Sequence, residues 1–224
     1  MAASTPGYTT VHADFVVDAS GANAIFARQQ GSQKIKTQPL VCLAARFAIK
    51  DAKDNCTQLT HLESVEHGWW YGAQLPNNYL LMALFCDART AKTQQLQQSD
   101  RWHELLGKAV NSAKLIESTE PLSDDITICN APSHCLDRLY GPHWLAVGDA
   151  ASSFDPIASQ GIIKSISNGL AAADVVLGKT DPVHYSQSIN AMYQLYLTMR
   201  DRYYQQEQRW PDSPFWQKYQ STAH

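Results

Sequence analysis

Residues 144–164 read WLAVGDAASSFDPIASQGIIK, which is the most informative segment of the chain. The apolar run 144–147 predicts a short strand, which ends in Gly148-Asp149; a turn with Asp-Pro follows, and Gly161 opens a helix. Asp149 would therefore lie at the C-terminal end of a strand, where α/β sheets bind ligands. The helix N-terminus nearby offers free N–H groups and a partial positive charge to an electron-rich partner. The simpler interpretation is that both glycines serve turns and that Asp149 is a helix cap.

The composition sets broad limits on function. The chain has 224 residues, enough for one large domain or two small ones with a buried core, and a formal net charge of −3. No basic stripe indicates nucleic-acid binding. No stretch approaches the roughly 18 apolar residues of a membrane span, and the first thirty residues lack the pattern of a signal peptide. We therefore expect a soluble, cytoplasmic protein with no nucleic-acid or membrane partner.

The cysteines do not indicate a metal site. They form no C-x-x-C pair and have no histidine at ligand spacing, so we expect free thiols and no bound metal. The five are Cys42, Cys56, Cys86, Cys129 and Cys135.

The chain before residue 144 predicts a mainly antiparallel sheet between two small flanking segments. The small residues of Ala2–Gly7 lead into a predicted buried strand, Val11–Asp18, and a short helix closed by Gly31. Turn residues 76–78 predict a hairpin. Ser99 or Asp100 could cap a helix reaching about Asn111. The further predicted strands are 39–49, 68–75, 79–86 and 126–129.

The C-terminal part predicts two helices. In the first, which Gly178 would end, Ile162, Ile166, Leu170 and Leu177 fall on one face. The second would begin with Asp181 as its cap and Pro182 in its first turn, and would end near Arg209, before Pro211 and Pro214. Its predicted packing stripe is Ile189, Met192, Tyr196, Met199 and Tyr203.

The opening stretch resembles the "GD" motif of class A flavoprotein monooxygenases and of their relatives, the flavin-dependent halogenases. The resemblance implies that Gly148 and Asp149 bind the ribityl chain of FAD. It also implies that the loop from Pro156 to Gly161 lies against the isoalloxazine ring, with Gln160 and Ile162 beside it. A helix terminus facing the ring would stabilise the anionic reduced flavin.

Two further segments carry the same resemblance. ADFVVDASGANAIFAR, residues 13–28, is similar to a strand-plus-Asp-x-x-Gly segment of that family and implies secondary FAD contacts from Asp18, Gly21 and Arg28. YYQQEQRWPDSPFW, residues 203–216, resembles the tail of a halogenase-like subgroup. That subgroup includes flavoproteins that modify tryptophan during maturation of quinone-cofactor amine oxidases and dehydrogenases. Together the three segments cover the chain from about residue 13 to residue 216.

The segment GWWYGAQLP, residues 68–76, bears on the choice between subgroups. It resembles the W-x-W-x-I-P element of halogenases but lacks the second Trp at that spacing and has Leu75 in place of Ile, which disfavours halogenation. Gln160 also stands where halogenases have Thr. Trp69 and Tyr71 lie on a strand that the family places in the substrate sheet, where an aromatic substrate could stack; packing of the sheet against a helix is the alternative.

These observations predict an α/β (α+β) fold: a partial FAD-binding domain of the class A monooxygenase type, an antiparallel substrate-binding sheet and C-terminal helices. The expected parts are 8–31 with 141–180, then 32–140, then 181–224. No Gly-x-Gly-x-x-Gly turn is present to hold the FAD pyrophosphate, so we expect weak FAD binding and no activity from this chain alone.

The expected function of the completed enzyme is oxidation of an aromatic, tryptophan-containing or peptide substrate, with the flavin and no side chain carrying the chemistry. A separate chain could supply the dinucleotide-binding half. The alternatives are a flavin-dependent halogenase and a non-catalytic fragment or subunit that pairs with a partner chain.

Overall fold

The computed structural model describes residues 10–36, 39–50 and 60–220, so the predictions for Ala2–Gly7 and Cys56 lie outside the described residues. The chain divides into two compact units. Unit 1 comprises residues 1–35, 135–153 and 160–192, and unit 2 comprises residues 36–134, 154–159 and 193–224. No helix in the described ranges combines the length and apolar character that crossing a membrane requires.

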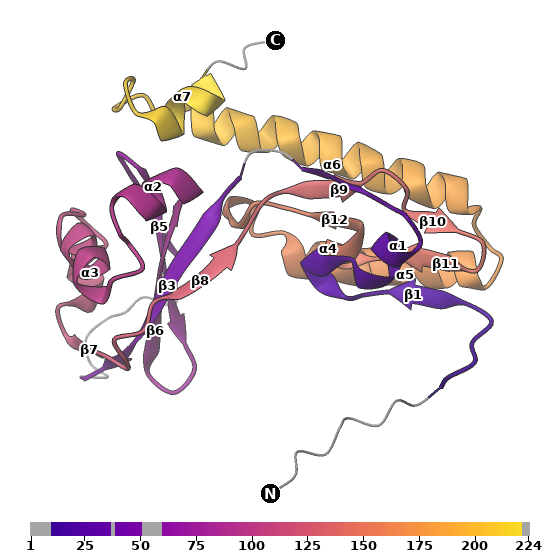
Figure 1. The fold of residues 1–224 in the computed structure, drawn as a ribbon, viewed down its shortest axis with the longest axis horizontal. Helices are drawn as coiled ribbons and strands as arrows, with labels where there is room; N and C mark the ends of the chain where they lie inside the picture. Colours follow the sequence, from indigo (N-terminus) through magenta and orange to yellow (C-terminus); the bar gives the residue numbers. More distant parts are fainter. Residues whose placement is uncertain (1–9, 37–38, 51–59, 221–224) are drawn as a thin grey trace, which may run out of the picture. The chain divides into compact units, whose positions relative to one another are not determined.

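Unit 1 is built on a parallel strand pair. β1 (Val16–Asp18) runs parallel to β11 (Trp144–Ala146), and β10 (Tyr140–Gly141) pairs antiparallel with the other side of β11 (Figure 1). The short helices η1 (Gly21–Asn23) and α1 (Ile25–Gln29) follow β1, whereas α4 (Gly148–Ala151) and α5 (Gly161–Val176) follow β11. A second small sheet has the order β12 (Ser152–Ser153), β9 (His134–Leu136), β2 (Lys34–Lys36).

The predicted N-terminal strand is shorter and more exposed than expected. Only residues 16–18 form β1, Val11 is 80% exposed, and Val17 is 44% exposed. Apolar residues alone cannot show which of their faces a neighbouring element covers. Here Asp18 is the buried residue of the strand.

The predicted apolar face of α5 exists, but it faces away from unit 1. The side chains of α5 that are buried are Lys164, Asn168, Ala172 and Val175. Gly178 ends the helix in the left-handed conformation, with φ +70°, as predicted. The predicted face is exposed: Ile162 80%, Ile166 62%, Leu170 69% and Leu177 66%.

Unit 2 is built on a six-stranded antiparallel sheet. Its strands are ordered β4 (His61–Val65), β5 (Gly68–Leu75), β6 (Tyr79–Cys86), β3 (Val41–Ile49) and β7 (Thr119–Pro121), while β8 (Thr127–Asn130) also pairs with β3. The predicted β5–β6 hairpin is confirmed, with Leu75 opposite Tyr79. Asn77 and Asn78 both have positive φ, which Asn tolerates in such tight turns.

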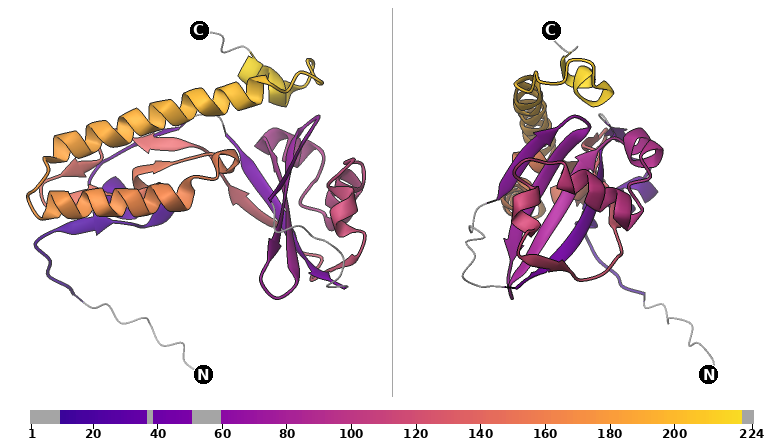
Figure 2. Two further views of the ribbon diagram at one scale, coloured as in Figure 1. Left: turned by 180° about the vertical axis from the view of Figure 1, so that it is seen from behind. Right: turned by 90° about the vertical axis from the view of Figure 1, so that its left-hand side faces the viewer.

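Each face of this sheet has its own cover. On one face Trp70 and Met82 pack against Trp102 and Leu106. The last two belong to α3 (Ser99–Gly107), which lies on the same side of the sheet as α2 (Ala88–Thr93) (Figure 2). The prediction for α3 was wrong at both ends, because Gln98 is its N-cap and it ends at Gly107, before η2 (Ala113–Ile116). The other face carries Leu40, Trp69, Ala83 and Phe85, which pack with Tyr204, Phe215, Trp216 and Tyr219.

The C-terminal helices differ from the prediction in their bounds and in their buried stripe. The cap at Asp181 is confirmed by a 2.7 Å bond from Val183 N, but α6 (Pro182–Gln205) ends before Arg209. Pro214 does not stop a helix; it begins α7 (Pro214–Gln220), where its missing N–H costs nothing. Met199 and Tyr203 are exposed. The stripe that is buried is Tyr185, Ile189, Tyr193, Tyr196, Arg200 and Tyr204.

Candidate functional site

The C-terminal ends of β1 and β11 form one edge of the unit 1 sheet. Asp18 pairs with Ala146 in the parallel register, and Val147 N donates to Asp18 O across 3.0 Å. The two segments that follow, Asp18–Gly21 and Gly148-Asp149, therefore lie next to each other, and α4 contacts η1. This edge is where parallel α/β sheets bind ligands. The structure thus brings together two of the three segments that carry the resemblance.

Asp149 at this edge is held by a buried lysine. Lys164 Nζ lies 2.8 Å from Asp149 Oδ1 and also donates to Ser152 O. The Lys164 side chain is 2% exposed, whereas that of Asp149 is 43% exposed. Burial lowers the pKa of Lys164, and the carboxylate of Asp149 opposes that shift. Among the residues that the structure describes, none donates a hydrogen bond to Asp149 Oδ2, so this oxygen can accept one from a ligand hydroxyl.

Gly148 and Gly161 occupy different environments. Gly148 has φ +56°, and a Cβ there would lie 2.9 Å from Ser165 Oγ of α5. It therefore allows α4 to approach α5 closely. Gly161 has open space around its Cα and begins α5, with Gln160 as the N-cap residue. Gln160, Gly161 and Ile162 are all exposed at this helix start.

Among the predicted residues of the N-terminal segment, Asp18 forms hydrogen bonds within that segment. Asp18 accepts hydrogen bonds from Ala27 N at 2.8 Å and from both the amide and the hydroxyl of Ser20. Burial would raise the pKa of Asp18, but these hydrogen bonds hold it below its ordinary value. Gly21 has φ +68°, and Arg28 is exposed. Asp18 therefore fixes the turn after β1, next to α4, the helix that carries Asp149.

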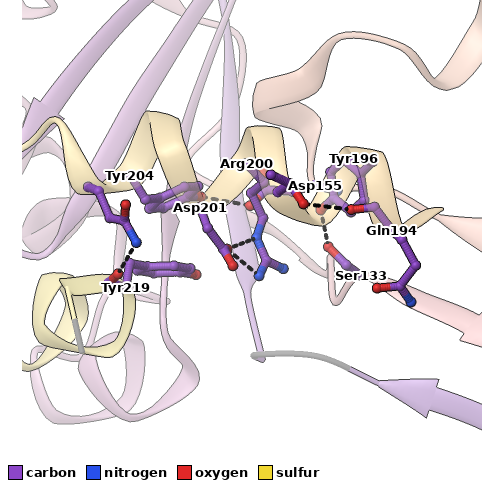
Figure 3. Close-up of polar contacts among 10 residues, drawn as sticks. Ser133, Asp155, Gln194, Tyr196, Arg200, Asp201, Tyr204 and Tyr219 are labelled. Carbon is purple, nitrogen blue, oxygen red and sulfur yellow. Dashed lines mark hydrogen bonds and ion pairs between the residues drawn. The ribbon is translucent and has the colours of Figure 1, made fainter. Parts of the chain in front are cut away.

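Pro156 belongs to unit 2, in η3 (Pro156–Ala158), and the residue before it forms a buried network that the sequence did not predict. Asp155 Oδ1 accepts from Ile157 N at 3.0 Å, and its Oδ2 accepts from Tyr204 Oη at 2.7 Å. Asp155 N donates to Tyr196 Oη, which also bonds Ser133 Oγ (Figure 3). Burial raises the pKa of Asp155. The Asp-Pro turn was visible in the sequence, but its tyrosine partners on α6 were not.

Trp69 joins this network and borders a cavity of unit 2. Its Nε1 donates to Tyr204 Oη at 2.9 Å, and its ring stacks on Phe85 with centroids 4.1 Å apart. A cavity of about 200 Å³ lies beside it, lined by Leu62, Ser64, Trp69, Ile157, Tyr204 and Trp216. Tyr71, the other residue predicted to contact substrate, is partly buried and packs at the edge of the same aromatic cluster.

Two glutamates also line this cavity. Arg209 lies 2.6 Å from Glu207 and holds the pKa of Glu207 at about 2. Burial would raise the pKa of Glu63, but hydrogen bonds from the Ser112 hydroxyl and amide and from Asn111 N keep it below its usual value. Both carboxylates are therefore ionised at neutral pH, and Arg209 compensates one of the two negative charges. The net charge of the three side chains stays negative, which disfavours an anionic occupant.

Residues 4–224 match the sequence profile of the family described as "Tryptophan halogenase". The chain belongs to the tryptophan halogenase family. It is 29% identical over 214 residues to LodB of Marinomonas mediterranea, which is named as an FAD-dependent oxidoreductase; the match covers 95% of this chain and 58% of LodB. The chain therefore spans less than two thirds of this relative.

Solved structures of this family share the fold. The myxobacterial chondrochloren halogenase CndH has a TM-score of 0.76 at 17% identity, covering 93% of this chain and 51% of CndH. The flavin-dependent halogenase CmlS has a TM-score of 0.71 at 22% identity, and the match covers 92% of this chain and 39% of CmlS. The peptidyl tryptophan dihydroxylase QhpG has a TM-score of 0.70 at 20% identity, and the match covers 84% of this chain and 45% of QhpG. The predicted family and fold class are confirmed.

Proposed function

We propose that this chain forms the ring-side part of an FAD site, and that the completed enzyme oxidises an aromatic side chain, namely a tryptophan within a peptide. The observation that carries the proposal is the Asp149 carboxylate. It lies at the C-terminal edge of the β1–β11 pair, fixed at one oxygen by Lys164 and open at the other. Membership of a family whose named relatives are flavin-dependent supports the choice of ligand.

The residues at this edge fit the ribityl half of FAD. Ribityl hydroxyls are hydrogen-bond donors, and Asp149, whose side chain is 43% exposed, can accept such a bond at Oδ2. The first-turn amides of α5 would face the electron-rich edge of the ring, where their partial positive charge favours the reduced anion. The predicted contacts from Gln160, Gly161 and Ile162 of unit 1 belong to this proposal, whereas the contact from Pro156, a residue of unit 2, stays a prediction. When bound, the reduced flavin would supply the activation of oxygen, and these residues would orient it.

The unit 2 cavity supports an aromatic substrate. Trp69, Tyr204 and Trp216 give it aromatic walls. The two ionised glutamates outweigh the single charge of Arg209, which favours a neutral or cationic occupant over an acid. A peptidyl indole meets both conditions, because its amino acid carboxylate is part of a peptide bond. The relative QhpG is named as acting on peptidyl tryptophan. Halogenation is the second reaction open to this family, and halide-dependent product formation by the completed enzyme would favour it.

The exposed face of α5 supports a partner for unit 1. Ile162, Ile163, Ile166 and Leu170 present a continuous apolar stripe, which a soluble helix normally buries. We propose that a dinucleotide-binding half, supplied by a further part of the protein or by a separate chain, covers this stripe and supplies the pyrophosphate contacts. FAD binding to the present chain alone would then be weak. The predicted domain limits and the predicted cytoplasmic location stay predictions.

A titration with two flavins tests this assignment. Riboflavin carries the ring and ribityl chain without the ADP. We therefore expect the fluorescence of riboflavin and of FAD to be quenched on binding, with similar dissociation constants. Asp149→Asn should weaken both, because one oxygen acceptor becomes a donor. The matched control is Asp174→Asn, which changes another partly exposed carboxylate of unit 1, on α5, where it pairs with Lys179. Failure of both flavins to bind, or a strong preference for FAD, would contradict a competent ring-side site.

A further inference from the structure

Cys42 and Cys129 lie directly opposite each other on β3 and β8, although they are far apart in the sequence. Ala131 N donates to Leu40 O across 2.8 Å, so Leu40 and Ala131 form a hydrogen-bonded pair of the antiparallel ladder. Such pairs alternate along a ladder, which makes Cys42 and Cys129 the next hydrogen-bonded pair. The Cα atoms of such a pair are about 5.5 Å apart, within the roughly 4.4–6.8 Å that disulfides span.

The two thiols differ in their surroundings. Cys129 is exposed to solvent, whereas Cys42 is partly buried against the sheet's aromatic cluster. Burial, with a smaller effect from Cys129, raises the pKa of Cys42 to about 12. Cys42 therefore keeps its proton at neutral pH, and Cys129 is the thiol that an oxidant can reach first.

The pair also lies in one row with the residues of the unit 2 cavity. Cys129 is opposite Cys42, Cys42 is opposite Phe85, and Phe85 is opposite Trp69. Paired residues of adjacent strands point to the same face of a sheet. The dithiol thus ends a lateral row that begins with the indole bordering the cavity, and Phe85 is the one side chain between them.

We propose that Cys129 and Cys42 form an oxidisable dithiol, which reacts with hydrogen peroxide to give a cross-strand disulfide. Cys129 gives up its thiol proton, the thiolate attacks one peroxide oxygen and the O–O bond breaks. The hydroxide that leaves takes up that proton, so the products are a sulfenic acid on Cys129 and one water. Cys42 sulfur then attacks Cys129 sulfur, the S–O bond breaks, and the Cys42 proton leaves with the hydroxyl as a second water. Two thiols are oxidised and one peroxide is reduced to two waters.

The geometry indicates a reversible bond. Cβ atoms of opposed strand residues are about 4.5–5.5 Å apart, somewhat more than the roughly 3.5–4.5 Å of relaxed disulfides, so closure must draw β8 towards β3. Strained and exposed disulfides are the ones that thiols reduce readily. The high pKa of Cys42 makes the second step accelerate with rising pH, because more of the attacking thiolate is present.

Mass spectrometry of the full chain tests the proposal. Peroxide should remove two hydrogens from the intact mass. After alkylation of the remaining thiols, tryptic digestion should show peptide 37–46, which contains Cys42, joined to peptide 115–138, which contains Cys129 and Cys135. The Cys135→Ser variant serves as the matched control, because it should still form the link and thereby assigns it to Cys129. Dithiothreitol should restore both peptides.

Single variants separate the two steps. In Cys42→Ser, Cys129 should stop at the sulfenic acid, which dimedone traps, whereas Cys129→Ser should lose the disulfide without gaining a dimedone adduct on Cys42. The wild-type result stands even where a variant fails to fold. A wild-type disulfide to Cys56 or Cys86, or oxidation of Cys129 past the sulfenic acid with no link to Cys42, would overturn the proposal.

Discussion

Tyr204 donates its hydroxyl hydrogen to Asp155 Oδ2 across 2.7 Å, at a point where both side chains are almost fully buried. The same hydroxyl oxygen accepts the Trp69 indole N–H at 2.9 Å. Burial raises the pKa of Asp155 and, with the nearby carboxylate, raises that of Tyr204 well above its ordinary value. Tyr204 therefore stays protonated and links the turn before η3 to the β5 strand of unit 2.

Tyr204→Phe should destabilise unit 2 by about 2–4 kcal/mol, because the Trp69 N–H and one Asp155 oxygen would each remain buried without a partner. The ring is kept, so the apolar packing changes little. Urea unfolding measures the effect as a lower midpoint at an unchanged m-value. Tyr203→Phe is the control: Tyr203 is 50% exposed, so the free energy of unfolding of this variant should stay within about 0.5 kcal/mol of wild type. Equal losses in both variants would contradict the network.

Asp149→Ala should destabilise unit 1 most at low pH. Lys164 would lose its carboxylate while staying buried, so its folded-state pKa, already lowered by burial, should fall further. The unfolded chain then binds more protons than the folded one, and stability rises with pH up to the unfolded-state pKa near 10.4. We expect a loss of about 2 kcal/mol at neutral pH, less than for a fully buried pair because Asp149 reaches solvent.

The double variant controls this experiment. Lys164→Met in the Asp149→Ala background removes the buried amine together with its partner, so denaturant unfolding at acid, neutral and alkaline pH should show recovered stability and no slope from this site. A pH slope that persists in the double variant would assign the effect to another group.

Local rules account for the parts of the fold that the sequence predicted. The asparagines of the β5–β6 turn, the Asp181 cap and the left-handed Gly178 each depend on a few adjacent residues, and the structure has all three. Periodicity identified the apolar face of α5 but could not show what covers it, because that depends on elements distant in sequence. The prediction of the buried stripe of α6 was wrong for a related reason. Several aromatic residues allow more than one stripe, and packing within unit 2 selects Tyr196, Arg200 and Tyr204.

The same division applies to the candidate site. Gly148-Asp149 and Asp18–Gly21 follow short predicted strands, so the sequence could place each at a strand end. The pairing of those strands, the ion pair from Lys164 and the tyrosines on Asp155 depend on tertiary contacts. The opposition of Cys42 and Cys129 depends on strand register, and a shift of one residue would separate them.

Gly148→Ala should destabilise unit 1, whereas Gly161→Ala should not. Alanine at φ +56° is strained by about 1–2 kcal/mol, and its Cβ would also meet Ser165 Oγ at 2.9 Å. At Gly161 a Cβ meets nothing within 4 Å, and alanine favours a helix by up to about 1 kcal/mol over glycine. Thermal unfolding of the two variants measures the difference. In Gly148→Ala, adding Ser165→Ala should recover only the part of the loss that comes from the clash.

Glu207→Gln should flatten the acid side of the stability profile. Hydrogen bonds from Arg209, including one of 2.6 Å from its terminal nitrogen, hold the pKa of Glu207 at about 2, below its ordinary value of 4.5. A depressed carboxyl pKa stabilises the folded state above the unfolded-state pKa, and this contribution disappears as the pH falls through the folded value. The free energy of unfolding of wild type should therefore fall between about pH 4.5 and pH 2, whereas that of Glu207→Gln should lack this fall. Urea unfolding of the two proteins at neutral pH and in this pH window measures the difference.

The control is Glu104→Gln, because Glu104 forms exposed pairs with Arg101 and Lys108. Exposed pairs contribute little, so that control should follow the wild-type profile, and a Glu207→Gln profile as steep as wild type would place the acid sensitivity elsewhere.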